Sequence, residues 1–113
     1  MKKFLVLYLS SMSAAEQMKT AGASESGKKM MDEWMKWFQA AGSSIVDGGS
    51  PLGSSAHVTK TGTQAHSGDY IGGYSIVQAE DMEAAKSIIA NHPHFMEEGN
   101  TIEILEVLPM PGM

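Results

Sequence analysis

The stretch KFLVLYL at residues 3–9 decides the fold of this chain, because apolar side chains alternate onto both sides of one extended segment. The segment is rich in residues that favour strands and ends at Ser10 and Ser11, so we predict a β-strand. A strand that is apolar on both sides must be covered on both sides. One side would carry Phe4, Val6 and Tyr8, and the other Leu5, Leu7 and Leu9.

Two helices are predicted further along the chain, at about residues 28–41 and 82–91. Gly42 is a suitable residue to follow the first helix, because glycine accepts a left-handed backbone. Asp81 is a good N-cap for the second helix, and Pro93 ends it. The apolar stripe of the first helix is expected to consist of Met31, Trp34, Met35 and Phe38, widened by Met30 and Trp37.

The remaining segments are predicted as strands and loops. Gly72 and Gly73 indicate a bulge or a close backbone approach inside a strand. Between the first strand and the first helix we expect a short helical turn at 13–20 and a small-residue break at 22–27. The strands are expected at 44–47, 70–79 and 102–108, with a further short strand or hairpin arm at 57–60 and a polar surface loop at 61–69.

This order of elements predicts a single α+β domain over residues 1–113. With right-handed crossovers, strand, helix, strand, strand, helix and strand form a ferredoxin-like βαββαβ sandwich, with an antiparallel sheet and helices on one face. The helices cover only one of the two apolar faces. We therefore expect a homodimer, in which a second chain covers the other face.

The composition excludes several classes of protein. Thirteen acidic against eight basic residues give a net charge of −5, which disfavours binding to duplex nucleic acid. The absence of cysteine excludes disulfides and thiolate chemistry, and we interpret the ten methionines as adaptable core residues. No segment approaches the length of a membrane span, and the apolar run at 4–9 is shorter than that of a signal peptide, so we expect a cytoplasmic protein.

Four stretches carry a resemblance to a known family. They are residues 4–9, GSSIVDGGSPL at 42–52, GYSIVQAEDMEAA at 73–85 and HPHFMEEGNTIEILEVLPM at 92–110. With them the chain resembles the YCII-related family of the dimeric α+β barrel superfamily, over nearly its whole length. The resemblance implies the sandwich fold and a dimer, and it does not transfer any particular chemistry.

The same resemblance bears on catalysis. Some YCII-related proteins use a histidine near the start of the main helix and an aspartate near its end for acid–base work. In this sequence Met31 and Ala40 stand at those two positions. Neither side chain carries a proton, so the resemblance supplies no catalytic pair here.

The middle of the chain holds the candidate catalytic residues. An acid–base cluster is expected there if the loop folds over a sheet cavity, because histidine titrates near neutral pH. The alternative is that these residues are solvated loop polars. The catalytic candidates are His57, His66 and Asp69, and the candidates for lining a ligand pocket are Tyr8, Asp47 and Tyr74.

A second pair of histidines offers a weaker possibility. His92 and His94 are two residues apart on a segment that Pro93 makes extended, so both rings can face one way, and Glu97 or Glu98 would complete a metal set. The alternative is a surface turn that ends the helix. We favour the turn, and we expect no metal and no cofactor.

Three functions remain open from the sequence. One is a cofactor-independent enzyme that acts on a small molecule through acid–base chemistry at His57 or His66. Aromatic molecules are among the substrates considered. The second is a non-catalytic protein that binds a small molecule or serves as an accessory protein. The third is a dimer that recruits a protein partner, for which the sequence holds no motif.

Overall fold

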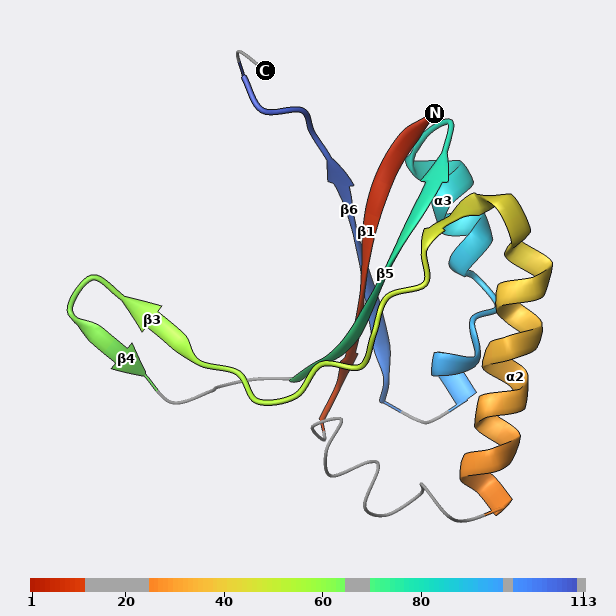
Figure 1. Ribbon diagram of the computed structural model, residues 1–113, viewed down its shortest axis with the longest axis horizontal. Coiled ribbons are helices and arrows are strands. Elements are labelled where there is room, and N and C mark those ends of the chain that lie inside the picture. Colours follow the sequence, from red (N-terminus) through yellow and green to blue (C-terminus); the bar gives the residue numbers. More distant parts are fainter. Residues whose placement is uncertain (12–24, 65–69, 97–98, 112–113) are drawn as a thin grey trace.

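The computed structural model describes residues 1–11, 25–64, 70–96 and 99–111, so the expected helical turn at 13–20 lies outside the described residues. The helices and strands of the sandwich follow one another in the order that the sequence predicts (Figure 1). Their bounds are β1 Lys2–Ser10, α2 Glu25–Ala41, β2 Ile45–Asp47, β3 His57–Thr59, β4 Gly62–Gln64, β5 Tyr70–Ala79, α3 Met82–Ile89 and β6 Thr101–Val107, with 3-10 turns at Gly42–Ser44 and Pro93–Met96.

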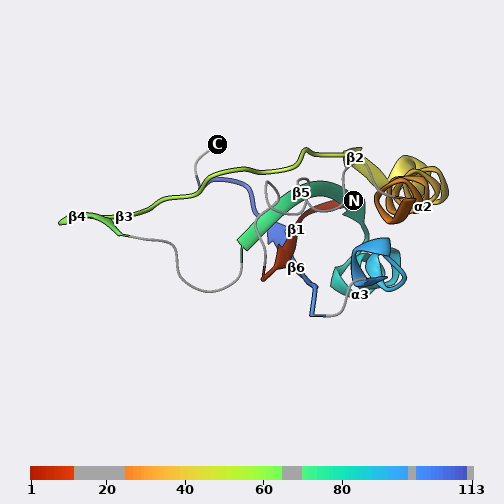
Figure 2. The ribbon, with the colours of Figure 1, turned by 90° about the horizontal axis from the view of Figure 1, so that it is seen from below.

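The main sheet has four antiparallel strands in the order β2-β5-β1-β6. Strand β1 lies in the middle and pairs with β5 on one side and β6 on the other. Both helices lie on the same side of this sheet (Figures 1 and 2). The α+β class and the ferredoxin-like sandwich are therefore confirmed. None of the helices within the described residues is long and apolar enough to cross a membrane.

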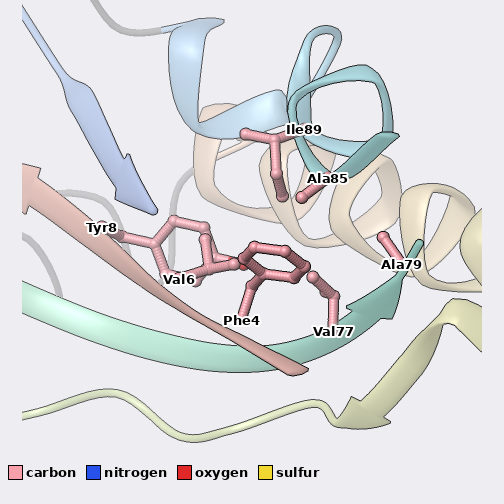
Figure 3. Packing of buried hydrophobic residues seen from close by; sticks show 7 residues of the cluster. All are labelled: Phe4, Val6, Tyr8, Val77, Ala79, Ala85 and Ile89. Atoms are coloured by element: carbon pink, nitrogen blue, oxygen red, sulfur yellow. The ribbon is translucent and has the colours of Figure 1, made fainter. Parts of the chain in front are cut away.

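The core lies between the sheet and the two helices (Figure 3). Alternate residues of β1 and β5 point into it, and α3 closes it from above. The indole Nε1 of Trp37 donates a hydrogen bond of 3.2 Å to the carbonyl oxygen of Ile88, which ties α2 to the end of α3. The buried apolar residues are Phe4, Val6, Tyr8, Val77, Ala79, Ala85 and Ile89.

The opposite face of the sheet has no cover within the described chain. Leu5 of β1 lies between Ile76 of β5 and Leu105 of β6, and Leu7 lies beside Tyr74. Leu105 is 41% exposed and Val107 is 48% exposed. The prediction that β1 is apolar on both sides is confirmed, and only one side is buried by this chain.

The glycine pair in β5 produces the predicted bulge. Tyr8 pairs with Gly73 while Leu9 pairs with Ile71, so Gly72 is the additional residue. A Cβ on Gly73 would lie 3.3 Å from the carbonyl oxygen of Ser50, so the close backbone approach is also confirmed.

The packing of α2 corrects the predicted stripe. Met31 is 64% exposed and Met35 is 54% exposed, whereas Trp34 and Trp37 pack against the core. The core-facing stripe therefore passes through the tryptophans. Met35 follows Trp34 by one residue, about 100° around the helix, and Met31 precedes Trp34 by three residues, about 60° to the same side. The helix also begins at Glu25, three residues before the predicted start. Met1, Met96 and Met110 are exposed as well, so the interpretation of the methionines as core residues is wrong for most of those described.

The predicted loop at 61–69 is partly wrong. Residues Gly62–Gln64 form β4, which pairs with β3 in a separate two-stranded sheet. The hairpin alternative for residues 57–60 is therefore the correct one. Polar composition concealed the second strand, because Gly62, Thr63 and Gln64 offer no apolar alternation.

The turn after β2 depends on a glycine that no other residue can replace. Gly49 has a φ of +78°, and its N–H donates a 2.8 Å hydrogen bond to Oδ1 of Asp47. A Cβ built on Gly49 would overlap the carbonyl oxygen of Tyr74 and lie 3.2 Å from Cα of Ser75. The turn therefore packs directly against the backbone of β5.

Replacing this glycine tests the packing. We expect Gly49→Ala to lower the free energy of unfolding by about 3 kcal/mol or more, from the left-handed backbone and the overlap with β5 together. Gly42→Ala, at φ +52° with no atom within 4 Å of the added Cβ, should lose only about 1–2 kcal/mol. Urea unfolding measures both, with Gly53→Ala as a neutral control, and equal losses at positions 42 and 49 would contradict the packing argument.

Candidate functional site

Five aromatic and imidazole rings from three parts of the fold meet beside the core. Tyr8 comes from β1, Trp34 and Trp37 come from α2, and His92 and His94 come from the segment that follows α3. The ring centre of His92 lies 4.2 Å from that of Trp37, 4.4 Å from that of Trp34 and 4.8 Å from that of Tyr8. We call these five residues the aromatic–histidine cluster.

His92 lies at the centre of the cluster and is 2% exposed. Its Nδ1 accepts a 2.9 Å hydrogen bond from the backbone N–H of His94, so the proton of the neutral ring is on Nε2. Within the described residues, this Nε2 is the one buried side-chain polar atom that has no hydrogen-bond partner. The faces of the neighbouring indoles are only weak acceptors, so a strong donor remains unused.

The surroundings of His92 oppose a positive charge. Burial, with a smaller contribution from the charge of His94, lowers the pKa of His92 from 6.5 to about 3. The ring is therefore neutral over the physiological range of pH. At neutral pH His92 offers a hydrogen-bond donor without carrying a charge.

Tyr8 belongs to a chain of hydrogen bonds that crosses from β1 to the turn after β2. Oγ of Ser75 donates to the carbonyl oxygen of Gly48 at 2.9 Å, so the hydroxyl of Tyr8 must donate to Ser75 Oγ, at 2.8 Å. Burial raises the pKa of Tyr8 to about 12, although the hydrogen bond with Ser75 acts in the opposite direction. The phenol therefore stays protonated.

His94 fixes the segment after α3 to the end of β1. Its Nε2 lies 2.9 Å from the carbonyl oxygen of Leu9, and because a carbonyl only accepts, Nε2 carries the hydrogen. The side chain of Asn100 donates to the carbonyl oxygen of His94 at 3.1 Å. In the neutral ring, Nδ1 of His94 is then an acceptor. His94 is 8% exposed, so this histidine too lies inside the fold.

The three residues predicted to line a pocket do not share one surface. Tyr8 points toward the helices, whereas Tyr74 pairs with Leu7 and lies on the open face of the sheet. Asp47 accepts from the N–H of Gly49 and so holds the turn after β2. The hydrogen bonds through Ser75 and Gly48 connect Tyr8 to that turn.

The three residues predicted as catalytic are not brought together in the described residues. His57 is exposed on β3, in the hairpin that extends away from the body of the molecule (Figure 1). His66 and Asp69 lie outside the described residues, so their cluster with His57 stays a prediction.

The metal alternative at His92 and His94 finds little support in the geometry. Their ring centres are 6.5 Å apart, and one nitrogen of each ring already bonds to the backbone. Glu97 and Glu98 lie outside the described residues. Among the residues that are described, no group of three or more histidine, cysteine or acidic side chains is placed to hold a metal ion.

Sequence reasoning missed the role of these two histidines. The interpretation of His92–His94 as a surface turn is wrong, because Pro93 and both histidines are buried. The tryptophans were recognised as core residues, but no periodicity connects α2 with a segment more than 50 residues later. The available signal was the pair Trp34 and Trp37, three residues apart on one helix, because their large rings pack well against another planar side chain.

Acid should destabilise the fold through His92. An unfolded histidine binds a proton below its ordinary pKa of 6.5, whereas the folded chain does not until about pH 3. The free energy of unfolding should therefore fall as the pH falls from 6.5 toward 3, by up to about 1.4 kcal/mol per pH unit from this group. Urea unfolding at several pH values between 7 and 4 measures the slope.

The matched variant is His92→Asn, which keeps an acceptor for the N–H of His94 and cannot titrate. We expect it to be less stable at pH 7 but to lose less stability on acidification. His57→Asn, at an exposed position, should follow the wild-type curve. An unchanged acid slope in His92→Asn would show that His92 is not the group responsible.

The comparison with known families agrees with this geometry. The family model of the YCII-related domain matches residues 4–111, from the first core residue of β1 to the proline-rich end. A search of curated proteins found no match to the sequence. The match covers almost the whole length of the chain, including every element of the sandwich. The chain belongs to the YCII-related domain family.

Proposed function

We propose that the chain acts as a homodimer that binds a small molecule at the aromatic–histidine cluster, without catalysing a reaction on it. The observation that carries this proposal is the buried Nε2–H of His92, which has no hydrogen-bond partner among the described residues. Buried donors in folded proteins are almost always paired, and an exception calls for a missing partner or a functional use. A ligand with an acceptor atom would supply that partner.

The rings around His92 indicate the rest of the ligand. Trp34 and Trp37 are half-buried, so the cluster reaches solvent along one side of α2. Aromatic rings bind flat, apolar bodies, and small-molecule sites commonly combine such walls with a few fixed polar groups. A small molecule with a flat ring and a carbonyl or similar acceptor fits this chemistry.

Protonation favours binding over catalysis. The pKa of Tyr8 is about 12 and that of His92 is about 3, so neither group changes its charge near pH 7. A general acid or base works best when its pKa lies near the operating pH. These two groups are therefore suited to holding a ligand by hydrogen bonds.

Benzamide, which joins a flat ring to a carbonyl acceptor, is a suitable first probe. We expect it to bind more tightly than toluene. We expect His92→Phe to weaken benzamide binding about tenfold, because one hydrogen bond is lost, and to leave toluene binding unchanged. Ligand-observed NMR and the fluorescence of Trp34 and Trp37 measure binding. His57→Phe is the matched control, and benzamide binding that survives in His92→Phe would overturn the proposal.

Acid–base catalysis is the second candidate, and His94 favours it. Its Nε2 is bonded to the carbonyl oxygen of Leu9, and its imidazole stands two residues from the donor at His92. The sequence adds His57 and His66 as proton carriers. The same NMR samples separate the two functions, because an enzyme converts its bound ligand over hours and a binding protein returns it unchanged.

The homodimer is proposed from the open face of the sheet. This face carries three leucines of β1 with Ile76, Leu105 and Val107, and among them stand Lys3 and Glu103. A mostly apolar face with one basic and one acidic residue is suited to an identical face, because a second copy brings the opposite charge as well as the cover. An isolated chain would leave this surface in water.

Sedimentation tests the dimer directly. We expect a particle of twice the 12.1 kDa chain mass at micromolar concentration. Leu105→Glu should shift it to the monomer mass, because it places a charge in the apolar contact. Met35→Glu, at an exposed position of α2, should leave the dimer intact. A wild-type monomer would contradict the proposal.

A further inference from the structure

We infer that the β3–β4 hairpin is an arm that packs against the second copy of this chain, beside the open face of the sheet. This inference rests on the proposed homodimer and names an additional contact within it. It goes beyond the packing of one sheet on another, because the arm is a separate element with its own surface.

The first observation is where the arm lies. In both views the hairpin extends on the side of the sheet opposite to the two helices (Figures 1 and 2). It therefore stands on the same side as the uncovered leucines. A second chain seated on the open face would lie alongside the arm, without any movement of the hairpin.

The second observation is that the arm has little support from its own chain. Among the described residues its strands pair with each other alone, through His57 with Gln64, Val58 with Thr63 and Thr59 with Gly62. They do not join the four-stranded sheet. An isolated two-stranded hairpin is marginally stable in water, so an ordered arm of this length needs a surface to pack on.

The third observation is the shape of the chain. The radius of gyration is 15.5 Å, and the extents are 46 × 45 × 20 Å. A compact chain of this length should have a radius of gyration of about 13 Å. The excess reflects a flat body with a projecting arm, which a second chain seated on the open face would fill out.

The arm offers one apolar side chain for this contact. Val58 is 71% exposed at the middle of β3, and the hydroxyl of Thr59 stiffens the turn by donating a 3.0 Å hydrogen bond to the carbonyl oxygen of Gly62. A valine that is this exposed on a two-stranded ribbon is suited to burial against a neighbour. We place Val58 in the contact with the second copy.

The absence of cysteine from the sequence makes a direct test simple. The variant Val58→Cys is labelled with a benzophenone maleimide, and 15N-labelled and unlabelled chains are mixed, allowed to exchange and irradiated. We expect crosslinks between heavy and light chains, identified by mass spectrometry. Met31→Cys, on the exposed side of α2, is the matched control and should give no such crosslinks.

A second measurement gives the size of the effect. Val58→Asp should raise the dissociation constant of the dimer at least tenfold, or about 1.4 kcal/mol, whereas Met31→Asp should leave it unchanged. Suppose that crosslinks form only within one chain, while the wild type is a dimer and Leu105→Glu shifts it to the monomer mass. That result would contradict the arm contact and leave the proposed dimer unaffected. A wild-type monomer would overturn both.

Discussion

Strand β1 is the constraint on which the rest of the structure depends. It is hydrogen-bonded on both edges, to β5 and to β6, and its side chains are apolar on both faces. Phe4 and Val6 are fully buried by the helices, while Leu5 and Leu7 lie on the face that the chain leaves open. The helices cover only one of these faces, so the strand that supplies much of the core also leaves an apolar face uncovered, and the proposed dimer rests on that face.

The fold was predictable from the sequence because the elements of the sandwich each carry a local signal. Asp81 caps α3 by accepting from the N–H of Ala84, Gly42 adopts a left-handed backbone after α2, and Gly72 forms the bulge, all as expected. Each feature depends on a few neighbouring residues. Local chemistry of this kind is visible in one sequence without knowledge of the rest of the chain.

The candidate site was less predictable because it depends on contacts across the chain. His92 is buried by Trp34 and Trp37, which lie more than 50 residues earlier, and no spacing rule connects them. The exposure of Met31 was missed for a related reason, since α2 presents apolar residues on more than one side and only the packing partner decides which are buried. The strand β4 was missed because its three polar residues show no alternation.

The hydrogen bond and ring contacts of Tyr8 connect ligand binding at the site to the stability of the fold. Tyr8 lies in the core, donates to Ser75 and contacts His92, so the ligand proposed for His92 would touch the same ring that fixes β1 to the helices. A ligand that binds the folded chain stabilises it by mass action. The proposed ligand site therefore lies against one face of β1, and the other face of the same strand is the one from which we propose the dimer.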